Sequence, residues 1–274
     1  MVSASLVLYH NKNKDVENVI SSVLKSPIDV LCIVDHSTND DFKSLSDKSN
    51  RIIYLHTEND GYGKGHNTGI KEILKETKSD YHIVLNPDIY FESDAIKQLI
   101  DFMDNTPDVG LVMPKVYYPD GRFQYLCKLL PTPADIFLRQ FAPASIRERN
   151  NERYTLKRVD YNNTMDIPSL SGCFMFFRTD AFEKIGGFDE RYFMHFEDID
   201  ITRRIGDISR TVYFPNATII HAHEAAHKTS KKMLLVGLKS AVKYFNKWGW
   251  LFDKERSKRN KEALKYMRTN VNRQ

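Results

Sequence analysis

The sequence contains few cysteines and no long apolar run. Its three cysteines, Cys32, Cys127 and Cys173, lie far apart with no CxxC spacing, which argues against a disulfide framework and a zinc knuckle. Nowhere do about 18 apolar residues follow one another, and the strand-like residues 3–9 lack the basic and apolar regions of a secretion signal. These absences predict a cytoplasmic protein without a membrane-spanning helix.

Glycine and proline are not in excess either, with 12 and 10 among 274 residues, which argues against extensive disorder. With 41% hydrophobic residues, the chain is long enough for one large α/β domain with a helical appendage. The net charge of +4 is mild, and the basic residues concentrate after residue 227. We therefore expect a local basic surface and no nucleic-acid partner.

Strand and helix patterns alternate over the first 113 residues. An apolar strand near Leu6 precedes a helix with Val16, Val19 and Ile20 on one stripe. Further strands are expected at 30–34, 52–55 and 81–85, and further helices around 70–74 and 96–103, the last capped by Ser93. Strands separated by helical crossovers predict a Rossmann-like, mainly parallel sheet flanked by helices.

The pattern loosens after residue 113. Prolines interrupt residues 114–165, which predicts loops, short strands and a flexible flap for acceptor specificity. Regular structure is expected again as a strand at 173–178, helices at 180–185 and 197–205, and a strand pair at 212–214 and 218–221. From residue 231 the pattern is helical and basic. We predict a domain at 1–228, with halves 1–113 and 114–228, and a helical extension at 229–274.

Polar residues follow several of the predicted strands. Tyr9 ends the first strand, Asp35 and Ser37 follow the second, and the Asn86-Pro87-Asp88 motif follows the strand at 81–85. Ligands of open α/β sheets bind beyond the carboxyl ends of the strands, so these residues are candidates for a binding site. A carboxylate at Asp88 suits Mg²⁺ or Mn²⁺. The alternative is that these segments are simple turns or helix caps.

Residues 59–69 hold four glycines and end in a helix start, where free N–H groups attract negative charge. The segment can cradle a phosphate or a sugar. It is not the dinucleotide fingerprint, because that motif follows the first strand and this one follows the third. A plain mobile loop is the alternative.

Two further groups can carry chemistry. Glu197 and Asp198 fall at a helix start after an aromatic run, which suits a general base, although both can simply stabilise the helix N-terminus. His221 and His223 lie on one face of a strand, so either is a candidate metal ligand. Lys228 and nearby lysines offer cations for a diphosphate.

Taken in order, these segments resemble the family-2 inverting glycosyltransferases of the GT-A fold, especially the bacterial rhamnosyltransferase-like branch that builds surface polysaccharides. The resemblance spans nearly the whole chain. The segments that carry it are Asp35-His36-Ser37, residues 59–63 and 67–70, residues 85–88, Ser171-Gly172-Cys173, residues 186–190, residues 196–200, and Pro215-Asn216-Ala217 with His221.

The resemblance implies a role for each matching residue. Asp88 is the metal ligand that ends a degenerate DxD motif whose first acid is Asn86 here, and His221 is the second ligand. Asp198 is the catalytic base, and Glu197 is its neighbour, which orients the acceptor or the loop. His223 matches no part of the family pattern. The expected nucleotide-sugar-binding residues are Tyr9, Asp35, Ser37, Gly61, Gly63, Asn67 and Asn86.

The predicted cofactor is Mn²⁺ or Mg²⁺. The predicted partners are a nucleotide diphosphate sugar, dTDP-rhamnose or a UDP-sugar, and a glycan or lipid-linked glycan acceptor in cell-envelope polysaccharide synthesis. The basic, aromatic C-terminal segment predicts peripheral membrane contact, unless its apolar stripe simply packs on the domain. Three alternatives remain at this stage: a nucleotide-dependent oxidoreductase, a metallohydrolase, and a non-catalytic sugar-nucleotide-binding protein.

Overall fold

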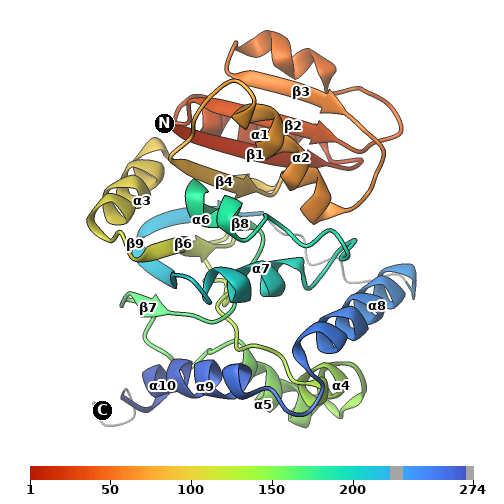
Figure 1. Cartoon of the computed structure of the whole chain (residues 1–274), viewed down its shortest axis with the longest axis vertical. Helices are drawn as coiled ribbons and strands as arrows, with labels where there is room; N and C mark the ends of the chain where they lie inside the picture. The colour runs from red at the N-terminus through yellow and green to blue at the C-terminus, as the bar shows by residue number, and fades with distance from the viewer. Residues whose placement is uncertain (223–230, 270–274) are drawn as a thin grey trace.

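The computed structural model describes residues 1–222 and 231–269 (Figure 1). Its centre is a nine-stranded sheet in the order β3-β2-β1-β4-β8-β6-β9-β5, with β7 paired to β9. The strands are β1 (Val2–Leu8), β2 (Val30–Asp35), β3 (Ile52–His56), β4 (Tyr81–Leu85), β5 (Ile89–Tyr90), β6 (Val109–Tyr117), β7 (Met165–Asp166), β8 (Phe174–Arg178) and β9 (Arg210–His221).

Helices cover both faces of the sheet. The first part of the chain supplies α1 (Asn13–Leu24), the 3₁₀ helix η1 (Lys43–Lys48), α2 (Tyr62–Leu74) and α3 (Ser93–Asn105). The second part supplies α4 (Pro133–Phe141), α5 (Ala144–Tyr154), α6 (Thr179–Lys184), α7 (Glu197–Ile205), α8 (Lys231–Trp248), α9 (Lys254–Ala263) and α10 (Lys265–Thr269). The α/β class is the one that the sequence predicts.

The parallel, doubly wound part lies in the first half of the chain. Strands β1, β2, β3 and β4 pair in parallel, and all seven residues of β1 are buried. Because side chains alternate along a strand, Leu6 packs in the core cluster that contains α1 and α3, whereas Val7 packs with Ile73 of α2. Parallel strands buried on both faces read as continuous apolar runs, which is why the sequence marks them clearly.

The second half of the sheet is mixed. Strand β8 runs antiparallel to β4 and β6, while β9 runs parallel to β6. The predicted strand pair at 212–214 and 218–221 is wrong, since both segments belong to the single strand β9. Its register against β6 shifts between Pro114 and Lys115, whose partners are Phe214 and Thr218. Proline lacks an N–H donor, so a bulge beside Pro114 and Pro215 keeps the strand continuous.

Residues 114–165 contain more regular structure than predicted. The prediction of loops and a flap is wrong for α4 and α5, which together span most of residues 133–154. Thr132 and Asp135 form a reciprocal capping box, and Pro133 occupies the first helical position. Proline there starts a helix instead of breaking one. The predicted Ser93 cap is also misplaced, because the cap position of α3 is Glu92.

The C-terminal helices pack against the sheet domain. Ala241, Tyr244 and Phe245 of α8 share a buried cluster with Phe196 and Ile199. Arg203 of α7 forms a bidentate pair with Asp253, with N–O distances of 2.7 and 2.8 Å, and its guanidinium lies 4.0 Å from the Trp248 ring centroid. The predicted boundary at 228/229 lies outside the described residues and remains a prediction.

Candidate active site

The first group of predicted binding residues lies at the carboxyl ends of β1 and β2. The His10 N–H donates to Ser37 Oγ at 2.9 Å, which joins the two strand ends. Asp35 is fully buried, and its carboxylate accepts from Ser37 N and from the Tyr54 hydroxyl, both at 2.9 Å. Tyr9, by contrast, is 55% exposed. Asp35 thus shapes the turn, while Tyr9 offers a ring surface to solvent.

The predicted glycine-loop residues pack closely against the segment that leads to α7. A Cβ on Gly61 would lie 2.4 Å from the Phe193 carbonyl oxygen, and one on Gly63 would lie 2.9 Å from Phe188 Cβ. Asn67 donates to the Phe188 carbonyl and accepts from the Phe188 N–H, both at 2.9 Å. These residues therefore join the start of α2 to the acidic segment.

Asp88 and His221, the two predicted metal ligands, lie close together. Ile89 pairs with His221 across β5 and β9, and this pairing leaves Asp88 Oδ1 3.3 Å from His221 Nε2. Gln124 sets the orientation of the imidazole. Its Nε2 donates to the His221 carbonyl at 2.8 Å, so its Oε1 faces His221 Nδ1 at 2.9 Å and accepts a hydrogen bond from it.

This arrangement fits a hard divalent cation. With the proton on Nδ1, the Nε2 lone pair of His221 is directed to the same side as the Asp88 carboxylate, as in metal sites whose histidine is fixed by an outer hydrogen bond. Among residues 1–222 and 231–269, no three His, Cys, Asp or Glu side chains cluster at metal-binding distance. Donor phosphate oxygens and water would complete the coordination. His223 and Lys228 lie outside the described residues.

A chain of hydrogen bonds links Asn86 to Asp198. The Tyr62 hydroxyl contacts Asn86 Oδ1 at 3.0 Å and the Gly172 carbonyl at 2.7 Å, and the Gly172 N–H donates to Asp198 Oδ2 at 3.3 Å. Burial raises the pKa of Tyr62 well above its usual value, so its hydroxyl remains a donor. Two segments that are distant in sequence, the end of β4 and the start of α7, are thereby brought together.

The turn before Asp198 has an unusual backbone. His195 and Phe196 have φ angles of 67° and 70°, in a region that residues other than glycine rarely occupy. Helix α8 holds this turn in place, because Ser240 donates to the Met194 carbonyl at 2.8 Å and the Phe196 ring packs against Tyr244. Such strain persists where surrounding structure enforces it, and it is frequent at functional sites.

Glu197 and Asp198 have different surroundings. Glu197 is buried, and this burial, followed by the neighbouring Asp198 charge, raises its pKa to about 8. Asp198 is partly exposed, and its Oδ1 accepts from the Ile199 N–H at 2.8 Å. At neutral pH Glu197 is thus mainly a neutral acid, while the partly exposed Asp198 is the carboxylate that a substrate can reach.

A cavity of about 360 Å³ lies beside the two acids, between α4 and α8. Lys128 and Arg139 line it together with both acids. Apolar lining comes from Ile136 of α4 and from Met233, Leu234 and Leu238 of α8. A space of this size with an apolar wall and a few charged groups is typical of a small-molecule site.

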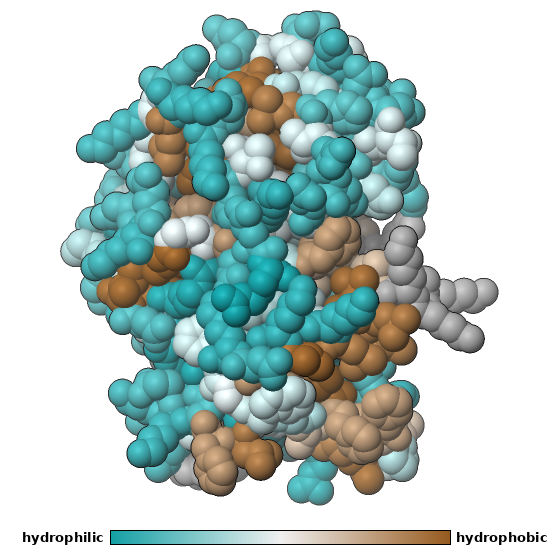
Figure 2. All heavy atoms as spheres, turned by 45° about the vertical axis from the view of Figure 1, so that its right-hand side comes forward, coloured by the Kyte–Doolittle hydropathy of each residue, from teal (hydrophilic) through white to brown (hydrophobic). Residues whose placement is uncertain are grey.

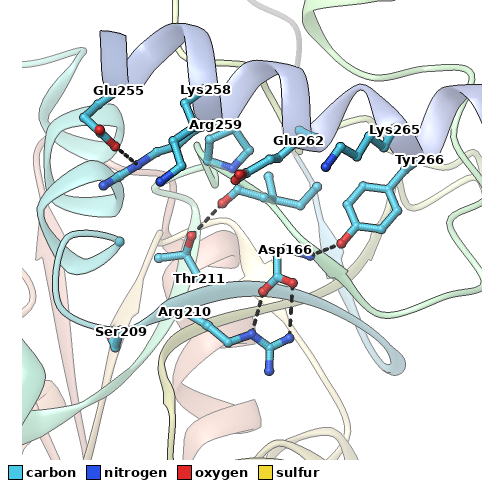
Figure 3. A pocket seen from close by; sticks show the side chains of 14 residues that line it. Asp166, Ser209, Arg210, Thr211, Glu255, Lys258, Arg259, Glu262, Lys265 and Tyr266 are labelled. Atoms are coloured by element: carbon cyan, nitrogen blue, oxygen red, sulfur yellow. Dashed lines mark hydrogen bonds and ion pairs between the residues drawn. The ribbon is translucent and has the colours of Figure 1, made fainter.

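Another cavity, of about 570 Å³, lies between α9–α10 and the strands β7 and β9 (Figure 3). None of the predicted site residues lines it. Several of its charged side chains pair with one another: Arg210 bonds to Asp166 at 2.8 Å, and Arg259 lies 3.9 Å from Glu255. We interpret this cavity as a junction between the C-terminal helices and the sheet.

The sequence reasoning gave no role to four residues that the structure places in the site: Tyr62, Gly172, Gln124 and Lys128. The sequence did indicate Gly172, because it belongs to the Ser171-Gly172-Cys173 segment that carries the family resemblance and that ends directly before β8. A Cβ there would lie 3.1 Å from Asp198 Cβ. Gln124 and Lys128 lie in the proline-rich stretch, where no periodic pattern marks them.

The overall fold is that of the GT-A glycosyltransferases. The solved structure of GalNAc-T7 with UDP, GalNAc and Mn²⁺ is similar with a TM-score of 0.66 and 12% identity, over 93% of this chain and 49% of that one. This chain thus spans about half the length of that protein. At this identity the likeness concerns the fold alone.

The chain belongs to glycosyl transferase family 2, whose match covers residues 6–186. Residues 153–228 also match a family described as the N-terminal domain of galactosyltransferase. The protein is therefore a glycosyltransferase. Membership in this family favours that function over the oxidoreductase, hydrolase and non-catalytic alternatives.

Two relatives are rhamnosyltransferases. An N-acetylglucosaminyl-diphospho-decaprenol L-rhamnosyltransferase of Mycobacterium tuberculosis is 28% identical over 225 residues, which are 77% of this chain and 71% of that protein. The rhamnosyltransferase WbbL of Escherichia coli K12 is 28% identical over 192 residues, 67% of this chain and 70% of that protein. Within the described part of the chain, no helix combines the length and apolarity needed to span a bilayer.

Proposed function

We propose that the protein is an inverting glycosyltransferase that moves a sugar from a nucleotide diphosphate to a hydroxyl of a lipid-linked glycan. Rhamnose is the first candidate for this sugar. The observation that supports this most is the chain of hydrogen bonds from Asn86 through Tyr62 and Gly172 to Asp198. It places a carboxylate beside the strand end that carries Asp88.

In this mechanism Asp198 is the catalytic base. The Gly172 and Ile199 N–H groups orient its carboxylate, and its remaining lone pairs accept the proton of the acceptor hydroxyl as that oxygen attacks the anomeric carbon. The nucleoside diphosphate leaves from the opposite face, so the configuration at the anomeric carbon inverts. Glu197 is mainly protonated at neutral pH, because its pKa is raised to about 8, so it adds little negative charge beside the base.

The donor side of the site rests on three groups. Tyr9 presents an exposed ring to the nucleoside, next to the turn that Asp35 and Ser37 shape. Asp88 and His221 would hold Mn²⁺ or Mg²⁺, and the bound cation would supply positive charge to offset that of the departing diphosphate. The donor is dTDP-rhamnose or a UDP-sugar, by analogy with the rhamnosyltransferase relatives and the UDP-containing neighbour.

The cavity between α4 and α8 is the proposed acceptor site. Lys128 and Arg139 suit the diphosphate of a lipid-linked acceptor, and Ile136 and Leu238 suit its hydrocarbon. This matches the diphospho-decaprenol named for the mycobacterial relative. We place the reaction at the cytoplasmic side of the membrane, in cell-envelope polysaccharide synthesis.

The test combines donor binding with transfer. Purified protein is titrated with nucleotide sugars with and without Mn²⁺, and transfer is assayed with an N-acetylglucosaminyl-diphospho-lipid acceptor. We expect Asp198→Asn to lower kcat at least about a thousandfold, a large share of the effect of a positioned base, with donor affinity within about threefold of wild type. The control is Asp180→Asn, an exposed acid on α6. Near-normal turnover by Asp198→Asn would refute the base assignment.

A further inference from the structure

Several large apolar side chains are exposed on α4 and on the turn that joins α8 to α9. Phe252 is 94% exposed and Leu251 78%, with Trp250 beside them; Phe137 and Phe141 of α4 are 62% and 67% exposed. We name these five residues the apolar surface. Figure 2 shows hydrophobic side chains gathered where α4 and α8 lie in the lower half of the molecule. Clusters of this kind mark interaction sites more often than single exposed residues do.

The turn that carries three of these residues is held in a fixed conformation. The side chain of Arg256, only 4% exposed as a residue, donates to the carbonyl oxygens of Trp250, Leu251 and Pro131, the last just before α4. Asp253, at the end of the turn, caps α9 through the Arg256 N–H at 2.9 Å. The backbone of the turn is thus anchored from inside, while its apolar side chains point outward into solvent.

The exposed charged side chains around the apolar surface are mostly basic, and the exposed acid nearest the turn along the chain is Glu255, at the start of α9. Helix α4 and residues 231–254 contain only two acids, Asp135 and Asp253, which are 4% and 8% exposed and pair with Arg153 and Arg203. Among the described side chains of α4 and residues 233–254, the exposed charges are the cations Arg139, Lys239, Lys243 and Lys254. An anionic surface complements this pattern, whereas a second copy of the same surface would repel it.

The apolar surface adjoins the cavity beside Glu197 and Asp198. Phe137 and Phe141 lie on the same helix as Ile136, Arg139 and Gln140, which line that cavity. Aromatic tips with flanking cations suit the boundary between lipid headgroups and acyl chains. We propose that the apolar surface docks on an anionic lipid bilayer, with Trp250, Leu251 and Phe252 entering the headgroup boundary. If the proposed function holds, the cavity then opens next to a lipid-anchored acceptor.

Binding to lipid vesicles tests the proposed membrane docking in the absence of donor and acceptor. The full chain is mixed with vesicles of phosphatidylcholine, alone or with phosphatidylglycerol, and sedimented. We expect binding to the anionic vesicles that weakens with added salt, and at least about tenfold weaker binding for Leu251→Ser/Phe252→Ser, which removes two apolar side chains from the contact. Both side chains are too exposed to matter for folding. Ile208→Ser, which removes a 40% exposed apolar side chain before β9, is the matched control and should bind as wild type.

Fluorescence gives a second readout, because Trp248 and Trp250 are the only tryptophans. Trp250 emission should shift to shorter wavelength with anionic vesicles, and Trp250→Phe should abolish the shift. Absence of vesicle binding, or equal binding by the double variant, would overturn the proposal. So would a wild-type dimer that the double variant converts to a monomer. Transfer to a water-soluble acceptor is measured separately. If wild type and the double variant transfer sugar equally well, the proposed reaction holds independently of the result with vesicles.

Discussion

Gln124 holds His221 through two hydrogen bonds, one from its amide nitrogen to the His221 carbonyl at 2.8 Å and one to its amide oxygen from His221 Nδ1 at 2.9 Å. The first bond fixes which end of the amide faces the imidazole, and the second fixes the tautomer. Nε2 of His221 therefore faces Asp88, whose Oδ1 lies 3.3 Å away. Gln124 is thus a positioning residue for the proposed metal pair.

We expect Gln124→Ala to weaken Mn²⁺ binding by about 10–100-fold, the usual effect of removing an outer hydrogen bond from a histidine ligand. The measurement is calorimetric titration of Mn²⁺ in the presence of a nucleoside diphosphate, with a thermal melt to check folding. Gln98→Ala on α3 is the matched control. Unchanged Mn²⁺ affinity in Gln124→Ala would show that the contact only supports the β9 backbone.

Glu197 should make stability depend on pH. Its pKa in the folded protein is about 8, against an ordinary value of 4.5, so between these values the unfolded chain releases a proton that the folded chain retains. Stability due to this group is full below about pH 4.5 and is lost as pH rises toward 8. Urea unfolding across this range should show wild type losing stability relative to Glu197→Gln. Glu183→Gln, at an exposed acid, should run parallel to wild type; a parallel Glu197→Gln profile would contradict the shifted pKa.

Gly61 couples the glycine loop to the segment before Asp198. Its φ of 105° is strained for other residues, and an added Cβ would also meet the Phe193 carbonyl, which accepts from the Tyr62 N–H at 2.9 Å. We expect Gly61→Ala to cost at least about 2 kcal/mol and to lower kcat, because the Phe193 segment must shift.

Gly121→Ala provides the control for backbone strain. Its φ is 83°, and nothing lies within 4 Å of an added Cβ, so only the conformational cost remains. Urea unfolding and kcat should therefore change more in Gly61→Ala than in Gly121→Ala. Equal losses of stability and of kcat in both variants would show that the close approach to Phe193 is not the cause of the effect of Gly61→Ala.

The Arg203–Asp253 pair should make the C-terminal helices part of the folding unit. Both side chains are at most 4% exposed, so Asp253→Ala leaves a buried, unpaired guanidinium. We expect a loss of about 3–5 kcal/mol in denaturant unfolding. Asp207→Ala breaks the more exposed pair with Arg259 and should cost less than about 1 kcal/mol. A small loss in Asp253→Ala would instead favour the predicted separate extension.

Prediction from the sequence was best where periodicity is strong. Strands β1, β2 and β4 and helices α1 and α7 were all identified, because buried parallel strands and amphipathic helices leave clear apolar patterns. The prediction was wrong at α4, because Pro133 suggested the break of a helix, whereas after the cap residue Thr132 it begins one. It was also wrong at β9, because Pro215 suggested a break between two strands, whereas the strand is continuous.

The candidate site, like the fold, was predicted from the sequence only in part. Asp88 is a candidate because polar residues that follow the strands of an α/β sheet meet at one edge. Asp198 is a candidate because it begins a helix after an aromatic run, and His221 because it shares a strand face with His223. Their roles stay predictions. Which groups lie between them could not be read from the chain, since Tyr62 and Gly172 meet only after the sheet has folded.

The sequence by itself determined the α/β class and the family, through local apolar periods and motifs whose order along the chain is fixed. The tertiary structure alone decided the orientation of His221 by Gln124, the elevated pKa of Glu197 and the anchoring of the strained turn by α8. Each of these depends on distance and burial between segments far apart in sequence. Burial and contact are properties of the packed chain, and no local pattern carries them.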